Sequence, residues 1–485
     1  MIRTRFAPSP SGRLHVGNAR IAVLNWLFAR HHDGQLVLRI EDTDEARTVP
    51  GAEAAILEDL EWLGLDWNEG PGVEGPAGEG DSGPYRQSER GAIYREHAER
   101  LIADGLAFRC FCTARELEER RAAALARGEA PHYDGACRAV SDVEAARLER
   151  EGRSPAIRFR VSDEGRIVVR DVVRGEVVFE AAEIGDFIIV RSDGVPTYNF
   201  AVVVDDASMA ITHVIRGAGH LSNSPRQVLL FEALGRELPV FAHVPTVLAP
   251  DRRKLSKRHG ARPLADYRRE GFHPDAMLNY LSLLSWSSPS GDEFLVRERL
   301  VNEISLDRIR ASDAVFDPEK LRWLSARHIE RMDLDALVDA VSPHIDRERH
   351  PIPDERLPAA VEAVRSHLST FAGIDDHLDA FVPLSDDAAS TIRRALSADP
   401  EAVAVIDAVS ARLRVLEEWT PPALDDAVRA GGRAVGARGA ALFRPLRLAL
   451  TGEEHGPPLS TVLFVHGRSA TLRVLESLRD AAGSV

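Results

Sequence analysis

The sequence has few cysteines and few aromatic residues for its length. Three cysteines stand among 485 residues, which excludes a disulfide-stabilised secreted scaffold and favours a reducing compartment. No apolar run approaches the roughly eighteen residues that a membrane-spanning helix needs. The first residues, Met1-Ile2-Arg3, carry no signal-peptide pattern. We therefore expect a cytoplasmic protein that does not enter a membrane.

An excess of positive charge is also lacking. The formal net charge is −15, which argues against indiscriminate binding of nucleic acids, because contact with phosphates needs local positive charge. A basic stripe on part of the surface remains compatible with this balance. Hydrophobic residues make up 44% of the chain, as in a globular protein. The length is too great for one core and predicts about three or four domains.

Two short segments far apart in the sequence carry the chemistry of a nucleotide site. His15-Val16-Gly17-Asn18 follows a strand-like run, Thr4-Arg5-Phe6-Ala7-Pro8, and opens a helical pattern. A glycine at a helix start lets a nucleotide approach the backbone, and the helix N-terminus offers N–H groups and a positive dipole to phosphates. The second segment, Lys254-Leu255-Ser256-Lys257-Arg258, concentrates donors that suit a leaving pyrophosphate. Together these segments predict a site that activates ATP.

Other segments make the comparison specific. They are Thr4 to Gly12, Leu38 to Asp44, Tyr85 to Arg90, Val203 to Asp206, Lys254 to Gly260, Phe316 to Trp323 and Arg444 to Gly452. In this order they resemble the bacterial-type glutamyl-tRNA synthetases, which are class I aminoacyl-tRNA synthetases. The resemblance covers nearly the whole chain.

The resemblance implies an α/β fold: a Rossmann-type doubly wound catalytic domain with an inserted acceptor-binding domain and an all-α C-terminal anticodon-binding region. A β-rich stretch at 157–191 and a helical pattern beyond Gly260 agree with it. The expected parts are the first catalytic half at 1–90, the acceptor-stem-binding insertion at 91–197, the second catalytic half at 198–262, a connecting stem-contact domain at 263–325 and a helical anticodon-binding domain at 326–485.

The resemblance also assigns residues to substrates. Carried onto this chain, it places ATP at His15, Gly17, Lys254, Ser256 and Lys257, of which His15, Lys254 and Lys257 stabilise the reacting phosphates. Formation of an aminoacyl adenylate is an in-line attack on the α-phosphorus, so the protein mainly positions reactants and stabilises charge. ATP enters with Mg²⁺.

Glutamate binding is assigned to a second set of residues: Arg5, Ser9, Glu41, Tyr198 and Arg216. Glutamate carries two carboxylates and an amine, so its pocket needs guanidinium groups and an acid. Arg5, Arg216 and Glu41 supply those types. A bidentate arginine donates to both oxygens of a carboxylate, whereas the amide of glutamine would direct N–H groups at the same cation. This pattern favours L-glutamate over glutamine.

A structural zinc site is predicted from the three cysteines. Cys110, Cys112 and Cys137 are similar to the zinc-binding pattern of some family members, in which a histidine follows where this chain has Ala139. A tetrahedral site needs four ligands, and the nearby candidates for the fourth are His132 and Tyr133. We therefore expect one Zn²⁺ in the inserted domain, with three ordinary buried thiols as the alternative.

One departure from the family pattern keeps other functions open. Ala218 and Gly219 stand between Gly217 and His220, where the family usually carries two acids. The expected function is the ATP-dependent attachment of glutamate to tRNA(Glu) by a monomer. The alternatives are transfer of glutamate to a modified tRNA base and a non-catalytic tRNA-binding paralogue. The sequence leaves open whether tRNA(Gln) is also charged.

Overall fold

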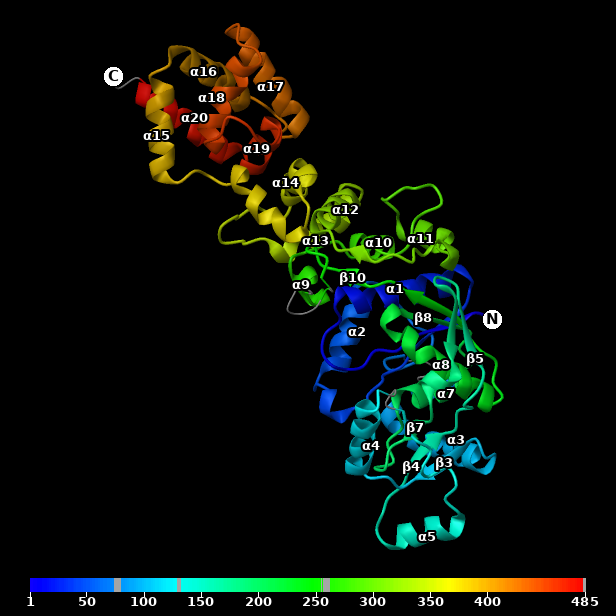
Figure 1. Ribbon diagram of the computed structural model, residues 1–485. Helices are drawn as coiled ribbons and strands as arrows, with labels where there is room; N and C mark the ends of the chain where they lie inside the picture. The colour runs from blue at the N-terminus through cyan, green and yellow to red at the C-terminus, as the bar shows by residue number, and fades with distance from the viewer. Residues whose placement is uncertain (74–79, 129–131, 254, 256–261, 483–485) are drawn as a thin grey trace. The chain divides into compact units, whose positions relative to one another are not determined.

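The computed structural model describes residues 1–73, 80–128, 132–253, 255 and 262–482 (Figure 1). The chain forms two compact units. The first consists of Met1–Tyr267 with Met277–Pro318, and the second of Arg268–Ala276 with Glu319–Val485. The five-part division expected from the sequence is finer than this split and stays a prediction.

The first unit begins with a strand, a helix and a parallel strand. Strand β1 (Arg3–Phe6) pairs in parallel with β2 (Gln35–Leu38), and helix α1 (Val16–His31) connects them. The helix is buried along most of its length, including Val23 and Leu27. The predicted helix is confirmed. Because every residue from Ala22 to Ala29 is buried, it packs on more than the one apolar face that the sequence pattern indicates.

A second parallel pair repeats this arrangement later in the chain. Strand β8 (His213–Gly217) pairs in parallel with β9 (Val240–Val244), and α8 (Ser224–Ala233) connects them. The backbone N–H of Thr212 donates to the carbonyl of Arg3 at 2.9 Å and so joins the two pairs. Parallel strands with helical crossovers are the predicted doubly wound α/β architecture.

A hairpin from the middle of the chain extends this sheet. Strands β5 (Arg166–Asp171) and β6 (Gly175–Glu180) are antiparallel, and Asp171 pairs in parallel with Phe241 of β9. The strand order is therefore β6-β5-β9-β8. The sequence analysis placed this hairpin inside the inserted domain. Its pairing with β9 brings Asp171 to the edge of the catalytic sheet, where it matters below.

Further strands form two smaller sheets in the first unit. The antiparallel sheet has the order β3-β4-β7, with β3 (Ala107–Cys110), β4 (Ala156–Phe159) and β7 (Phe187–Val190), and a short parallel pair joins β10 (Val247–Leu248) to β11 (Ala314–Val315). The remaining α-helices up to residue 303 are α2 (Ala52–Trp62), α3 (Gly91–Ala103), α4 (Ala114–Ala126), α5 (Asp142–Arg150), α6 (Ala181–Ile184), α7 (Tyr198–Ser208), α9 (Leu264–Arg269), α10 (Pro274–Leu283) and α11 (Arg297–Glu303).

From residue 318 onward, every regular element among the described residues is helical, as predicted (Figure 1). The α-helices are α12 (Pro318–Glu330), α13 (Leu334–Val341), α14 (Leu357–Val364), α15 (Asp386–Ser397), α16 (Pro400–Arg414), α17 (Pro421–Ala434), α18 (Ala440–Thr451), α19 (Leu459–His466) and α20 (Arg468–Ala482). A Cβ on Gly431 would lie 2.8 Å from the Cα of Val409, so only glycine allows α17 to approach α16 this closely. Within the described ranges, no helix is long and apolar enough to cross a membrane.

Candidate functional site

A cavity of about 470 Å³ lies where β1, α1 and β8 meet. Ser9, His15 and Gly17 line it from the first strand–helix connection, and Ala218 and Gly219 line it beyond the end of β8. In doubly wound sheets, nucleotides bind at the carboxyl ends of the parallel strands, which is where this cavity lies. The start of α1 faces it with N–H groups, so its chemistry suits phosphates.

His15 caps helix α1. Its Nδ1 accepts the backbone N–H of Gly17 at 3.1 Å. Since Nδ1 is the acceptor, Nε2 carries the proton of the neutral ring and is the nitrogen that can donate. A Cβ on Gly17 would lie 3.0 Å from Cε1 of His15, so any larger residue there would push the imidazole out of place.

The basic segment predicted to bind pyrophosphate is only partly described. Lys254, Ser256 and Lys257 lie outside the described residues, and so does Arg258. Leu255 is described and lines the same cavity as His15. The roles of the two lysines and the serine therefore stay predictions from the sequence.

Buried ion pairs connect the first strands to helix α7. Arg39 donates from Nη1 to Asp206 at 2.7 Å and from Nη2 to Glu41 at 3.2 Å. Arg5 donates from Nε to the same Asp206 at 3.2 Å. Arg39 is fully buried, and its Nε also lies 3.5 Å from Asp205. One buried acid thus orients both Arg5 and Arg39.

Glu41 differs from Asp206 in the direction of its pKa shift, which is upward for Glu41 and downward for Asp206. Burial raises the pKa of its carboxyl group, and the opposing pull of Arg39 and Arg5 does not cancel that effect. A buried carboxylate with incomplete compensation attracts a cation. The arrangement therefore fits the α-ammonium group that the sequence analysis assigned to this residue.

Arg216 lies at the end of β8 and is 5% exposed. Its Nε donates to Nε2 of His243 at 3.0 Å, and its Nη2 donates to Oγ of Ser224 at 2.9 Å. Its Nη1 is buried without a hydrogen-bond partner. Burial lowers the pKa of this guanidinium, with Tyr198, Arg5, Asp206 and Glu41 as the interacting neighbours. A buried donor of this kind is available for an anionic ligand.

The structure thus brings together four of the five residues assigned to glutamate: Arg5, Glu41, Tyr198 and Arg216 interact electrostatically. The hydroxyl of Tyr198 lies 3.0 Å from Nδ1 of His220. The fifth residue, Ser9, lines the nucleotide cavity beside His15. The assigned positions are consistent with one pocket that joins an amino acid to a nucleotide, although their individual roles stay predictions.

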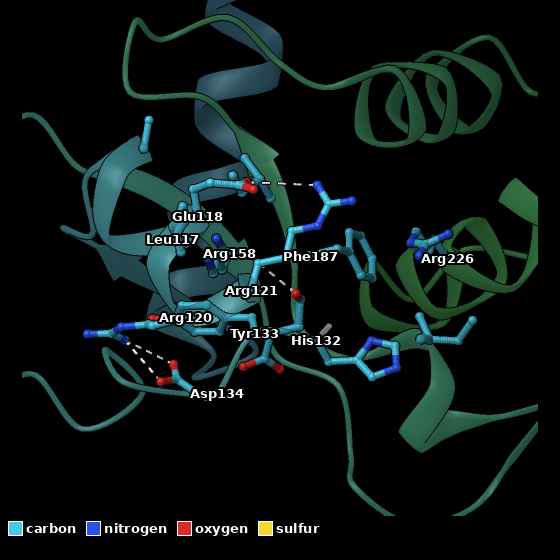
Figure 2. A pocket seen from close by; sticks show the side chains of 14 residues that line it. Leu117, Glu118, Arg120, Arg121, His132, Tyr133, Asp134, Arg158, Phe187 and Arg226 are labelled. Carbon is cyan, nitrogen blue, oxygen red and sulfur yellow. Dashed lines mark hydrogen bonds and ion pairs between the residues drawn. The ribbon is translucent and has the colours of Figure 1, made fainter. Parts of the chain in front are cut away.

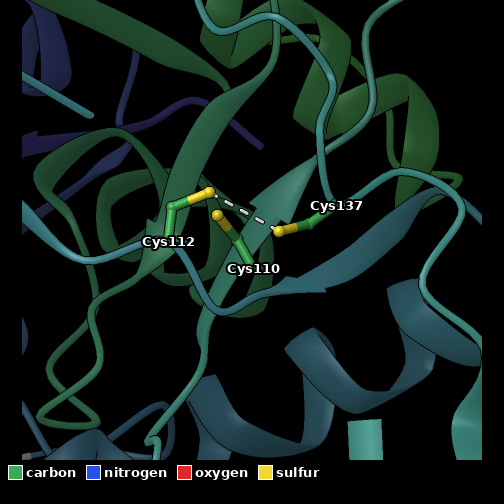
Figure 3. Close-up of side chains that lie close together, drawn as sticks. All are labelled: Cys110, Cys112 and Cys137. Atoms are coloured by element: carbon green, nitrogen blue, oxygen red, sulfur yellow. Dashed lines mark hydrogen bonds between the residues drawn. The ribbon is translucent and has the colours of Figure 1, made fainter. Parts of the chain in front are cut away.

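The three cysteines form a separate cluster (Figure 3). The sulfur atoms of Cys110, Cys112 and Cys137 lie within 4.8 Å of one another. The hydroxyl of Tyr133 lies 3.5 Å from Cys110 Sγ and 3.8 Å from Cys112 Sγ. Among the described residues, no histidine belongs to this cluster, and His132 lines the neighbouring pocket instead. Three thiols and one phenol match the donor number of a tetrahedral zinc site.

The thiols of Cys110 and Cys112 respond differently to their surroundings. Burial opposes ionisation of Cys110, but hydrogen bonds with Tyr133 and Arg158 lower its pKa. Burial and the neighbouring Cys110 and Cys137 raise the pKa of Cys112 to about 12. Burial likewise raises the pKa of Tyr133, and Cys110 adds to this effect. A bound cation reverses this penalty, because it stabilises the thiolate and phenolate forms. The donor set therefore fits a metal ion.

A second cavity, of about 570 Å³, adjoins the cysteine cluster (Figure 2). Its lining includes four arginines: Arg120, Arg121, Arg158 and Arg226. Arg120 pairs with Asp134 at 3.0 Å, and Arg158 lies over the ring of Tyr133 with its Cζ 3.9 Å from the centroid. Three acids, Glu118, Asp134 and Asp186, share this lining, and Arg121 lies 3.9 Å from Glu118. The lining is therefore mixed in charge, with a small excess of guanidinium groups.

Comparison with known proteins identifies the family. Residues 1–323 match the model "tRNA synthetases class I (E and Q), catalytic domain", and residues 336–478 match the model of an anticodon binding domain. The chain belongs to the class I tRNA synthetases of the glutamate and glutamine type. The expected family and fold class are thereby confirmed.

Relatives match the synthetase over its full length. It is 44% identical to a glutamate–tRNA ligase of Heliobacterium modesticaldum, with 99% of this chain and 97% of that protein covered. A glutamate–tRNA ligase of Moorella thermoacetica is 43% identical, with 98% and 97% covered. A crystal structure of a glutamate tRNA ligase from Elizabethkingia meningosepticum, in complex with its amino acid, superposes with a TM-score of 0.84 at 30% identity, and 99% of each chain is covered.

Four residues of the candidate site were not predicted from the sequence. Asp206 and Arg39 stood only inside matched segments, and Asp171 and His243 were not considered. One compositional signal went unused: three of the 61 lysine and arginine residues are lysines, and two of them are Lys254 and Lys257. In a chain that otherwise uses arginine, two lysines so close together indicate a position where a compact ammonium group is needed.

Proposed function

We propose that this synthetase attaches L-glutamate to the 3′ end of tRNA(Glu) through a glutamyl-adenylate intermediate. One observation carries the proposal. Arg216 presents a buried, unpartnered Nη1 close to Arg5 and Glu41, next to a nucleotide cavity at the start of α1. Two guanidinium groups and one carboxylate match the charges of glutamate.

The first step joins glutamate to ATP, which arrives with Mg²⁺. The α-carboxylate of glutamate attacks the α-phosphorus, and pyrophosphate leaves. His15 Nε2 donates to a phosphate oxygen, and Lys254, Ser256 and Lys257 hold the pyrophosphate as negative charge builds up on it. In the second step the terminal ribose hydroxyl of tRNA takes the glutamyl group and AMP leaves.

Glutamate is selected over glutamine by charge. Arg5 and Arg216 bind the side-chain carboxylate, while Glu41 accepts the α-ammonium group. Tyr198 and Ser9 close the pocket between the amino acid and the nucleotide. A neutral amide cannot neutralise two guanidinium groups in a buried pocket, so glutamine leaves uncompensated charge.

The arginine-lined cavity of Figure 2 binds the acceptor end of tRNA. Arg226 offers a guanidinium group to phosphates, and Phe187 offers an aromatic ring to unpaired bases. Zinc held by Cys110, Cys112, Cys137 and Tyr133 stabilises the loop behind this cavity. The helical region 326–485 binds the anticodon.

The synthetase acts as a monomer. It acts in the cytoplasm, which agrees with its three free cysteines.

Transfer to a modified tRNA base is disfavoured, because relatives that carry the name glutamate–tRNA ligase cover the helical region as well. A non-catalytic role is disfavoured by the retained His15 and Arg216. At Gly219 an added Cβ would meet nothing within 4 Å, so the missing acids leave space and do not block the cavity.

An ATP–pyrophosphate exchange assay separates these functions. The proposed synthetase exchanges pyrophosphate when glutamate and tRNA(Glu) are present and then forms an ester at the terminal adenosine. Charging assays with tRNA(Glu) and tRNA(Gln) decide whether the second tRNA is an alternative substrate. Absence of exchange under all conditions would support the non-catalytic alternative.

A further inference from the structure

Three adjacent strands bring an acid, an imidazole and a guanidinium into one buried line. Asp171 ends β5, His243 lies in β9 and Arg216 lies in β8. Arg216 and His243 are direct partners in the parallel register of β8 and β9. The exposed fraction is 5% for Asp171, 0% for His243 and 5% for Arg216. Buried polar groups of this kind must satisfy one another.

The direction of each hydrogen bond follows from the chemistry of arginine. Arg216 Nε can only donate, so His243 Nε2, 3.0 Å away, accepts with its lone pair. The ring proton then resides on Nδ1 and is donated to Oδ2 of Asp171 at 2.6 Å. Asp171 is itself held by three backbone N–H groups, those of His243, Val173 and Arg174. The tautomer of His243 is thus fixed from both sides.

Electrostatics keeps the imidazole of His243 neutral, so that its Nε2 can accept the hydrogen bond from Arg216. Burial lowers the pKa of His243, and Arg216 lowers it further, while Asp171 acts in the opposite direction. The ring is therefore neutral near neutral pH. Protonation of Nε2 would remove the acceptor and place two cations side by side.

The same contacts leave one atom of Arg216 for a ligand. Nε is bound to His243 and Nη2 to Ser224, whereas Nη1 is buried without a partner. Ser224 Oγ also lies 3.2 Å from His243 Nε2, so Ser224 contacts both Arg216 and His243. Fixing two of the three guanidinium nitrogens sets both the position and the plane of the group.

We propose that Asp171, His243 and Ser224 are positioning residues, which hold the guanidinium of Arg216 so that its Nη1 meets the side-chain carboxylate of glutamate. The proposal rests on the proposed function. It adds three residues that affect glutamate selection without touching glutamate, because they act through Arg216. Glutamate finds a donor already oriented, and the protein does not have to order a flexible arginine when the substrate binds.

A matched pair of substitutions at His243 tests the proposal. His243→Gln retains an acceptor near the place of Nε2, whereas His243→Asn retains a donor toward Asp171 but withdraws the acceptor from Arg216. Loss of a buried hydrogen bond to a charged group predicts that His243→Asn raises the glutamate KM by about tenfold or more. His243→Gln should stay within about threefold of the wild type, and the KM for ATP should be unchanged in both.

A general loss of folding would change both variants alike and would also change the KM for ATP. Equal glutamate KM values for the Gln and Asn variants, or a parallel rise in the KM for ATP, would overturn the proposal. Should both variants fail to fold, Ser224→Ala decides, since it removes one oxygen only. A glutamate KM raised about threefold at constant ATP KM supports the proposal, and an unchanged one overturns it. Failure of the wild type to exchange pyrophosphate with glutamate would instead contradict the proposed function.

Discussion

Single residues carry the selectivity and the catalysis in this synthetase. Arg216 has one buried nitrogen without a hydrogen-bond partner, which we propose for the substrate, and Glu41 bears a carboxyl group whose pKa is raised by burial. Neither property is legible in the sequence, because each depends on partners from distant strands. The residue types themselves were predictable, since the motifs that carry Arg5 and Glu41 stand in family order.

Removal of the Arg216 side chain should damage glutamate binding far more than ATP binding. Arg216→Ala removes charge-assisted hydrogen bonds worth about 1.5–3 kcal/mol each, so we expect the glutamate KM to rise by at least tenfold. Steady-state kinetics with glutamate and ATP varied separately measures the effect. Unchanged glutamate KM and kcat would make Arg216 a structural residue and leave the substrate acid to Arg5.

The scarcity of lysine leads to a second prediction at this scale. Lys257→Ala should reduce adenylate formation by about 10²-fold or more, because it withdraws an oriented positive charge from the leaving pyrophosphate. Lys257→Arg should also lose activity, since the chain uses arginine almost everywhere else and retains lysine here. Pyrophosphate exchange measures both variants. A kcat within threefold of the wild type in the folded alanine variant would remove Lys257 from the mechanism.

At the scale of elements, local patterns predicted strands and helices but not all of their partners. Apolar spacing located α1, and β-branched runs located β5 to β7. The union of β5 with β9 rests on a long-range pair, Asp171 with Phe241, which no local pattern encodes. This pairing places Asp171 beside His243 and so completes the hydrogen-bonded row from Asp171 to Arg216. A strand pairing that the sequence did not predict therefore supports the candidate site.

The buried ion pairs tie α7 to the first two strands. Arg39 contacts Asp205, Asp206 and Glu41. Arg39→Met therefore leaves three buried acids without this positive charge. We expect a loss of about 3–5 kcal/mol of stability. Urea unfolding followed by tryptophan fluorescence measures it. Arg147→Met, which removes exposed pairs with Glu144 and Glu151, is the matched control and should change the midpoint much less. Equal midpoints for both variants would contradict a structural role for the buried pairs.

The cysteine cluster yields a prediction about metal. Purified protein should contain near one zinc per chain, and Tyr133→Phe should weaken zinc binding, because it removes the hydroxyl that lies 3.5 Å from Cys110 Sγ. His132→Ala is the control and should retain zinc, since His132 lines the neighbouring cavity. Elemental analysis and competition with a chelator measure both. Three freely titratable thiols without zinc would establish a degenerate site.

At the scale of the whole molecule, charge is distributed unevenly. The net charge of −15 opposes tRNA binding over the surface as a whole, so the proposed binding must depend on local groups such as the arginines that line the cavity of Figure 2. We expect the KM for tRNA to rise steeply with salt, by about tenfold or more between 50 and 200 mM, whereas the KM for glutamate changes little in its buried pocket. Aminoacylation at several salt concentrations measures this. Equal salt dependence of both constants would argue against localised phosphate contacts.

The central claim is that buried guanidinium groups beside an ATP site select glutamate for attachment to tRNA. Aminoacylation of tRNA(Glu) with glutamate and with glutamine, at matched concentrations, tests it most directly. We predict ATP-dependent formation of glutamyl-tRNA, with a kcat/KM for glutamine lower by about 10²-fold or more. Comparable values for the two amino acids, or no glutamyl-tRNA from folded protein, would contradict the account.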